Sequence, residues 1–134
     1  MPMWLKSKRL LRLTRLSTVH KGRHFESLAM DYLQQHGLRD FQFNFQCRTG
    51  EIDLIARDGN TLVFIEVRYR KSRSHGSPVD TVTLQKQKKI MRTAQHFLQK
   101  NGLTHTVACR FDVIGITGEG DALTFDWRKQ AFCA

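Results

Sequence analysis

Apolar positions in the first third of the chain have the spacing of an α-helix. Between residues 25 and 33 they recur every three or four residues, at Phe25, Leu28, Ala29, Tyr32 and Leu33. Gly37 follows, and glycine commonly ends helices because it adopts left-handed backbone angles without a steric cost. This pattern predicts a helix over about residues 23–36.

The pattern then changes to the two-residue period of strands. Phe41, Phe43 and Phe45 alternate with polar residues, which predicts a half-exposed strand. Two more strands are expected over residues 52–57 and 62–70. The sequence Asp58-Gly59-Asn60 between them is a strong β-hairpin signal.

The second half predicts another helix and further strands. Ser77-Pro78 is typical of a helix start, and an apolar stripe follows as far as Gly102, at Val79, Val82, Ile90, Ala94, Phe97 and Leu98. Residues 107–116 read as a strand, and a short strand is expected near residues 123–125. The order is α-β-β-β-α-β with a last strand. A helical crossover makes the third and fourth strands parallel neighbours, so the fold class is α/β, a mixed β-sheet flanked by helices.

Composition is that of a globular domain. The chain has 134 residues, of which 40% are hydrophobic and 25% charged. Its apolar runs are far shorter than the roughly 20 residues of a membrane helix, so no membrane span is expected. The three cysteines share no CxxC spacing, which argues against a disulfide framework or a zinc site and favours a reducing cytoplasm.

The charge is strongly positive and clustered. The formal net charge is +10 and the sequence pI is about 10.1. Residues 6–23 contain basic residues and no acid, and residues 68–92 contain basic residues opposed only by Asp80. Such segments suit contact with the phosphates of nucleic acid, and the candidate contacts are Arg70, Lys71, Arg73, Lys88 and Lys89. The alternatives are a solvated basic face, or leucines among arginines near residue 11 lying on an anionic membrane. We expect a basic extension over residues 1–20 and one domain over residues 21–134.

Three acidic residues interrupt the apolar strands at Glu51, Asp53 and Glu66. If the hairpin turns on Gly59-Asn60, Asp53 falls opposite Glu66, and Glu51 and Arg68 share their face. A three-residue loop would instead put the two acids on opposite faces. Two carboxylates about 5 Å apart repel by roughly 3 kcal/mol at a dielectric of 20. A divalent cation would remove that repulsion, and oxygen ligands suit Mg²⁺ or Mn²⁺. The alternative is ordinary ion pairs with neighbouring arginines.

Other residues have two interpretations each. Lys86 lies on the apolar stripe of the second helix, and it either snorkels outward, which we favour, or reaches the sheet and supplies positive charge to a scissile phosphate. Asp112 is either paired with a neighbouring cation, which we favour, or a further metal ligand. Tyr69 and Trp127 either pack in the domain, which we favour, or stack on bases.

Several motifs in the right order resemble one protein family. They are residues 50–56 (GEIDLIA), 63–70 (VFIEVRYR) and 110–114 (RFDVI), with Glu26 before Ala29, Lys86-Gln87, and the closing Ala131-Phe132. Over about residues 20–134 the chain resembles the YraN family of bacterial proteins. That resemblance implies a restriction-endonuclease-like fold, related to Holliday-junction resolvases, with a D…ExK-type site.

Carried over by residue, the resemblance makes Asp53 and Glu66 the metal ligands and brings Glu26 to the site from the first helix. Arg68 occupies the position of the usual lysine. Arginine can offset phosphate charge but cannot act as a base, because it does not lose its proton.

We therefore expect a Mg²⁺- or Mn²⁺-dependent nuclease acting on DNA. Glu26 and Glu51 assist the two metal ligands, Glu51 as a further candidate metal ligand, and Arg68 and Lys86 offset charge. Cutting both strands of a junction would favour a homodimer. The alternatives are a nucleic-acid-binding module without turnover and a basic adaptor protein.

Overall fold

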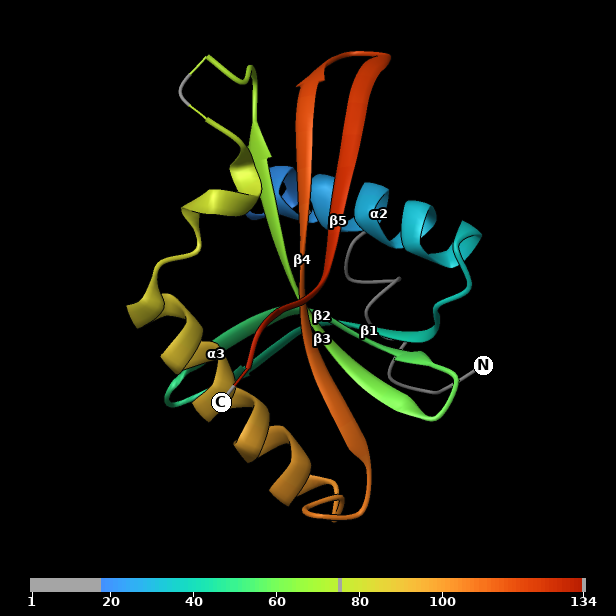
Figure 1. Ribbon diagram of the computed structural model, residues 1–134, viewed down its shortest axis with the longest axis vertical. Helices are drawn as coiled ribbons and strands as arrows, with labels where there is room; N and C mark the ends of the chain where they lie inside the picture. Colours follow the sequence, from blue (N-terminus) through green and yellow to red (C-terminus); the bar gives the residue numbers. More distant parts are fainter. Residues whose placement is uncertain (1–17, 75, 134) are drawn as a thin grey trace.

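The computed structural model describes residues 18–74 and 76–133, which form one five-stranded sheet with two helices (Figure 1). The elements are, in chain order, α2 (Thr18–Gln35), β1 (Arg39–Cys47), β2 (Gly50–Asp58), β3 (Thr61–Arg70), the 3-10 helix η1 (Pro78–Thr81), α3 (Leu84–Lys100), β4 (Ala108–Glu119) and β5 (Ala122–Phe132). The strand order across the sheet is β1-β2-β3-β4-β5. Of the predicted basic extension, residues 1–17 lie outside the described residues, and residues 18–20 belong to α2.

The sheet has the predicted pairing. β2 and β3 are antiparallel with Asp58 opposite Thr61, so the hairpin turns on Gly59 and Asn60 as expected. β3 and β4 are parallel neighbours, joined by the crossover through η1 and α3. The other pairs are antiparallel. The predicted α/β mixed sheet flanked by helices, consistent with a nuclease-like fold, is confirmed.

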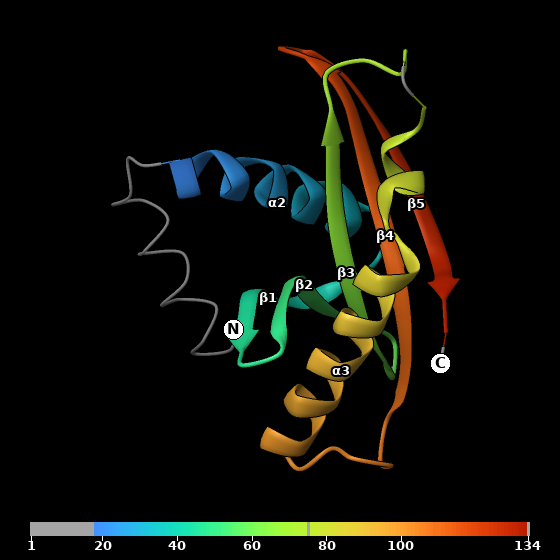
Figure 2. The same cartoon turned by 90° about the vertical axis from the view of Figure 1, so that its left-hand side faces the viewer.

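The helices cover opposite faces of the sheet (Figure 2). Along β3, Val63 and Ile65 pack into a core with α2, whereas Leu62 and Phe64 pack into a second core with η1 and α3. Because successive residues of a strand face opposite sides, a near-continuous apolar run such as Leu62–Ile65 can supply both cores.

The predicted second helix is interrupted. Pro78–Thr81 form only η1, Val82 is extended, and α3 begins at Leu84. Thr83 caps α3, since its side chain accepts a hydrogen bond from the backbone N–H of Lys86 at 3.1 Å. The expectation of one helix from Ser77 was therefore wrong, because a cap in mid-sequence starts a new helix.

Tertiary packing explains why η1 stands apart from α3. The turn lies on Gly115 of β4, where a Cβ atom would come within 2.9 Å of Val79 and 3.1 Å of Pro78. Only glycine leaves room for this approach. The η1 turn is thus held close to β3, because Gly115 is the β4 partner of Arg68.

The last strand is longer than predicted. β5 spans Ala122–Phe132 rather than a few residues near Leu123. Its far half is held by the buried carboxylate of Asp112 on β4, which accepts hydrogen bonds from Trp127 Nε1 at 2.9 Å and from the backbone N–H of Gln130 at 3.0 Å. Among the described residues, no helix is long and apolar enough to cross a membrane.

Candidate functional site

β2 and β3 separate at the two predicted metal ligands. Their pairing ends at Leu54 and Ile65, one residue before Asp53 and Glu66. The rest of β3 pairs with β4 alone. The two acidic residues therefore stand at a fork in the sheet, where their side chains are not covered by a continuing ladder.

The β1–β2 hairpin changes face at the same place. Leu54 packs in the core on the α2 side, but Ile52, two residues earlier, packs on the α3 side. Residues two apart in a regular strand share a face, so the ribbon turns over between them. In this register Asn44 lies across from Asp53. The φ of Asn44 is 54°, in the left-handed region that asparagine tolerates better than most residues.

The carboxyl groups of Asp53 and Glu66 are in hydrogen-bonding contact. Asp53 also accepts a hydrogen bond from the backbone N–H of Val67 at 2.9 Å. Asp53 is half-buried, and only 6% of Glu66 is exposed. The expected meeting of the two carboxyl groups is therefore present in the structure.

Burial and mutual repulsion change how this pair ionises. Burial raises the pKa of Glu66 to about 8, the charge of Asp53 acts in the same direction, and Lys86 and Arg68 oppose both. Burial also raises the pKa of Asp53, against the effect of the Val67 N–H and of the hydrogen bond with Glu66. With these neighbours alone, the pair retains a proton at neutral pH.

Two cations flank Glu66. Arg68 Nη2 lies 3.1 Å from Glu66 Oε2, and Lys86 Nζ lies 3.8 Å from the same oxygen. Lys86 thus reaches the sheet from the first turn of α3 instead of only snorkelling outward as we expected, and its contact with a phosphate stays a prediction. The side chain of Arg68 is 31% exposed and that of Lys86 35%, so both adjoin solvent as well as the buried acid. Arg68 Nε is buried with no hydrogen-bond partner among the described residues.

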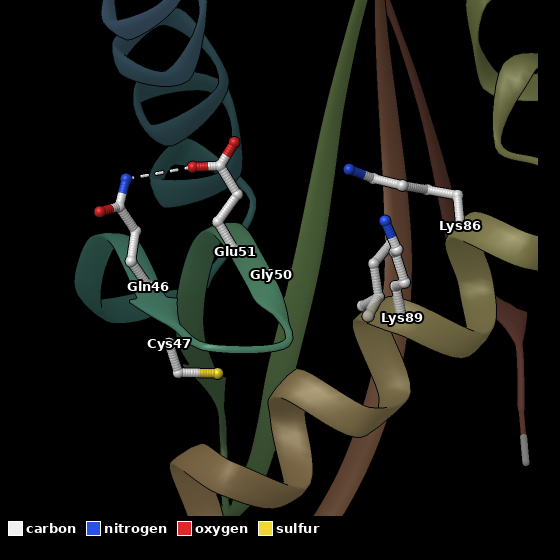
Figure 3. Close-up of a pocket in the computed structure, with 7 residues that line it drawn as sticks. Gln46, Cys47, Gly50, Glu51, Lys86 and Lys89 are labelled. Carbon is white, nitrogen blue, oxygen red and sulfur yellow. Dashed lines mark hydrogen bonds between the residues drawn. The ribbon is translucent and has the colours of Figure 1, made fainter.

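The other two predicted acids, Glu51 and Glu26, lie near Asp53. Glu51 is exposed and accepts a hydrogen bond from Gln46 Nε2 at 3.2 Å (Figure 3). Its charge raises the pKa of Asp53, so it acts on the pair through space. Glu26, from α2, lines a cavity together with Asp53. Within the described part of the chain, no group of three or more His, Cys, Asp or Glu side chains is arranged to hold a metal ion.

A cationic cavity of about 380 Å³ lies on the α3 side of the site. Lys86 and Lys89 line it from α3, and Glu51 lines it from the start of β2, with its carboxylate turned toward Gln46 (Figure 3). Thr93 of α3 ties the β1–β2 turn to the helix, because its hydroxyl lies 3.1 Å from that of Thr49. The cavity walls are therefore held at a defined separation.

The predicted phosphate contacts fall into two groups on either side of η1 (Figures 1 and 2). Arg70 ends β3, and Lys71 and Arg73 are exposed in the following loop, where Lys71 pairs with Glu119 at 3.1 Å. Lys88 and Lys89 are exposed on α3.

The favoured interpretation of Asp112, a strand acid paired with a neighbouring cation, is confirmed. Arg110 donates to Asp112 at 2.9 Å and to Asp58 at 2.8 Å, so Asp112 is an ion-paired strand acid. Tyr69 packs on the ring of Phe25 and donates its hydroxyl hydrogen to a backbone carbonyl.

The sequence did not predict that Asn44 and Gln46 belong to the site. Asn44 lies across from Asp53, and Gln46 donates a hydrogen bond to Glu51. The only local signal was that each is a polar residue between phenylalanines, which the alternating pattern explains equally well as solvent exposure. The turn of the ribbon at Asn44 depends on contacts with both cores, which no local pattern reports.

The fold and the site define an α/β protein with a nuclease-like arrangement of strands and a buried carboxyl pair. The sequence model described as "Uncharacterised protein family UPF0102" matches residues 25–116. The chain belongs to this family, which confirms the resemblance to YraN proteins. It is 50% identical to a UPF0102 protein of Chromohalobacter salexigens over 85% of this chain and 91% of the relative. It is also 49% identical to one of Nitrosococcus oceani, over 84% and 90% of the two chains, and 44% identical to one of Vibrio cholerae, over 84% and 91%.

Proposed function

We propose that this protein is a divalent-metal-dependent nuclease that hydrolyses phosphodiester bonds in DNA. The observation that carries the proposal is the contact between the carboxyl groups of Asp53 and Glu66, at a fork in the sheet, beside Arg68 and Lys86. Buried acids in contact are costly in a strand and need a compensating partner. A cation and a phosphate would together supply that partner.

The residues present fit a Mg²⁺ or Mn²⁺ ion. Asp53 and Glu66 offer oxygen donors only, the ligands that these cations prefer. Mg²⁺ is commonly held by one or two carboxylates, with water and substrate phosphates completing its ligands, so two protein ligands suffice. A pKa of about 8 for Glu66 indicates that a proton occupies the pair at neutral pH, where a divalent cation would replace it. Such an ion supplies Lewis acidity toward water and a phosphate oxygen.

Each residue of the site would then have a separate role in hydrolysis. Asp53 and Glu66 hold the ion, and Glu51 adds negative charge near Asp53. Arg68 and Lys86 offset charge on the scissile phosphate, since both adjoin the acid and remain partly open to solvent. A guanidinium does not act as a base, so Arg68 would serve only as a cation at the phosphate, and the proton of the attacking water would pass to solvent. Glu26 lines the same cavity as Asp53, on the α2 side of the sheet.

Nucleic acid is the substrate that the surface charge supports. The net charge is +10, and exposed cations lie on both sides of η1, in the loop after β3 and on α3. These residues suit phosphates and have no arrangement for reading base edges in a groove. We therefore propose binding without strict sequence preference.

Metal binding is the first test. Isothermal calorimetry with Mn²⁺ and Mg²⁺ should show binding to the wild type that Asp53→Asn abolishes. Asp126→Asn is the matched control, because Asp126 pairs with Arg128 on β5, outside the site. Equal binding by the wild type and Asp53→Asn would contradict the metal site.

Cleavage is the second test. Supercoiled plasmid and branched DNA are incubated with Mg²⁺ or Mn²⁺ and each of the three proteins. The wild type and Asp126→Asn should cut, and Asp53→Asn should not. If the wild type binds DNA but is inert on every substrate, the protein is a nucleic-acid-binding module. The ion pair between Glu66 and Arg68 is the observation that favours that alternative.

A further inference from the structure

A second cavity reaches the carboxyl pair from the opposite side of the sheet. It has a volume of about 240 Å³ and is lined by Phe25, Glu26, Asp53, Val67 and Tyr69. Phe25, Val67 and Tyr69 pack against the core on the α2 side, whereas the cationic cavity is walled by α3. Because the ribbon turns over at Asp53, this one residue borders the α2-side cavity while touching Glu66, which faces α3.

The two cavities differ in chemistry. Lys86 and Lys89 line the α3-side cavity, which suits a phosphate. Among the described residues, no basic side chain lines the α2-side cavity. Its walls are two aromatic rings, a valine and two acids. A phosphate would be repelled by Glu26 and Asp53. A flat, uncharged ring with N–H donors would pack on the aromatic wall and donate to the carboxylates.

The aromatic wall is held in place before any ligand arrives. The rings of Phe25 and Tyr69 are stacked, with centroids 3.9 Å apart and an angle of 19° between their planes. The hydroxyl of Tyr69 donates to the carbonyl of Gly118 at 2.6 Å, which fixes the ring from its far end. A fixed ring lowers the entropy lost when a ligand stacks on it.

We propose that the cavity formed by Phe25, Glu26, Asp53, Val67 and Tyr69 accepts one unpaired nucleobase of the substrate, next to the phosphate bound on the cationic side. The inference rests on the proposed function and names its substrate class, which is nucleic acid with an unpaired nucleotide at the cleavage position. A paired base inside a duplex is stacked between its neighbours and cannot enter a cavity beyond the carboxyl pair without leaving the stack.

The experiment compares three labelled duplexes of equal length by fluorescence anisotropy in EDTA. One carries a single bulged adenine, one the same bulge without its base, and one is fully paired. The bulged and abasic duplexes carry the same phosphates, so their affinity ratio reports the base alone. For the wild type, the bulged adenine should bind about tenfold more tightly than the abasic bulge, as expected for stacking of one base on aromatic side chains.

Two variants test the cavity and one serves as control. Phe25→Leu removes part of the aromatic wall, and Val67→Phe fills the cavity while keeping the backbone N–H that holds Asp53. Both should bring the ratio close to one. Phe125→Leu is the matched control, because Phe125 is a half-buried ring stacked on Tyr32 of α2 at 4.7 Å but does not line the cavity. It should keep the wild-type ratio. Circular dichroism identifies any variant that fails to fold, and the remaining cavity variant then decides.

A wild-type ratio near one overturns the inference, as does a control that loses the ratio as fully as the cavity variants. If cleavage remains metal-dependent in either case, the proposed nuclease function stands. A protein that binds none of the three duplexes and cuts no DNA overturns both proposals.

Discussion

Replacing Glu66 with glutamine should make the metal-free protein more stable at alkaline pH. Only 6% of Glu66 is exposed, and its carboxyl contacts that of Asp53. Its pKa is raised from 4.5 to about 8, chiefly by burial. The folded protein therefore keeps a proton on this group at pH values where the unfolded chain has lost it.

The sign of the effect follows from this difference. Below about pH 4.5 both states are protonated and the stabilisation is fully present. As pH rises toward 8 the unfolded state is increasingly favoured, because it ionises freely. One pKa unit corresponds to 1.36 kcal/mol, so the free energy of unfolding should fall by at most about 5 kcal/mol across this range. Glutamine stays neutral at every pH, so the free energy of unfolding of Glu66→Gln should not fall in this way.

Urea denaturation in EDTA at pH values from 5 to 9 measures the effect. The free energy of unfolding of Glu66→Gln minus that of the wild type should be small at pH 5 and reach several kcal/mol above pH 8. Glu119→Gln is the control, since Glu119 is 61% exposed and pairs with Lys71. Added Mg²⁺ at pH 8 should stabilise the wild type and leave Glu66→Gln unchanged. A difference that stays constant with pH would refute the reasoning.

Three further results are expected. Arg68→Lys should keep cleavage, whereas Arg68→Ala should lower the rate far more than DNA affinity, because one phosphate contact is minor beside the others; equal rates for both variants would contradict its role in charge stabilisation. Asp112→Ala should lower the free energy of unfolding by about 3–5 kcal/mol, since it leaves Arg110 without its buried partner; a loss under 1 kcal/mol in urea denaturation would contradict this. A plot of the logarithm of DNA affinity against the logarithm of salt concentration should fall steeply between about 50 and 200 mM. Lys88→Ala and Lys89→Ala should each reduce the slope of that plot by about one. A flat response would argue against phosphate contacts.

The strands, their pairing and the meeting of two acids could be predicted from the sequence. The hairpin register depends on Gly59 and Asn60 and on the two-residue period of β2 and β3, which are local features. That register brings Asp53 and Glu66 to the same level of the two strands, just beyond the last paired residues, Leu54 and Ile65. The parallel pairing of β3 with β4 follows from the handedness and length of a helical crossover. The residues matching the family's motif supplied the roles that spacing alone left open.

Tertiary packing determined the rest of the site. The break between η1 and α3 depends on Pro78 and Val79 lying against Gly115, a residue far along the chain. That break sets where α3 begins, and so whether Lys86 snorkels or reaches Glu66. The turn of the ribbon at Asn44 and Asp53 arises because the hairpin contributes to two cores on opposite faces. Periodicity reports the average burial of a segment, whereas the direction of one side chain depends on contacts between residues distant in sequence.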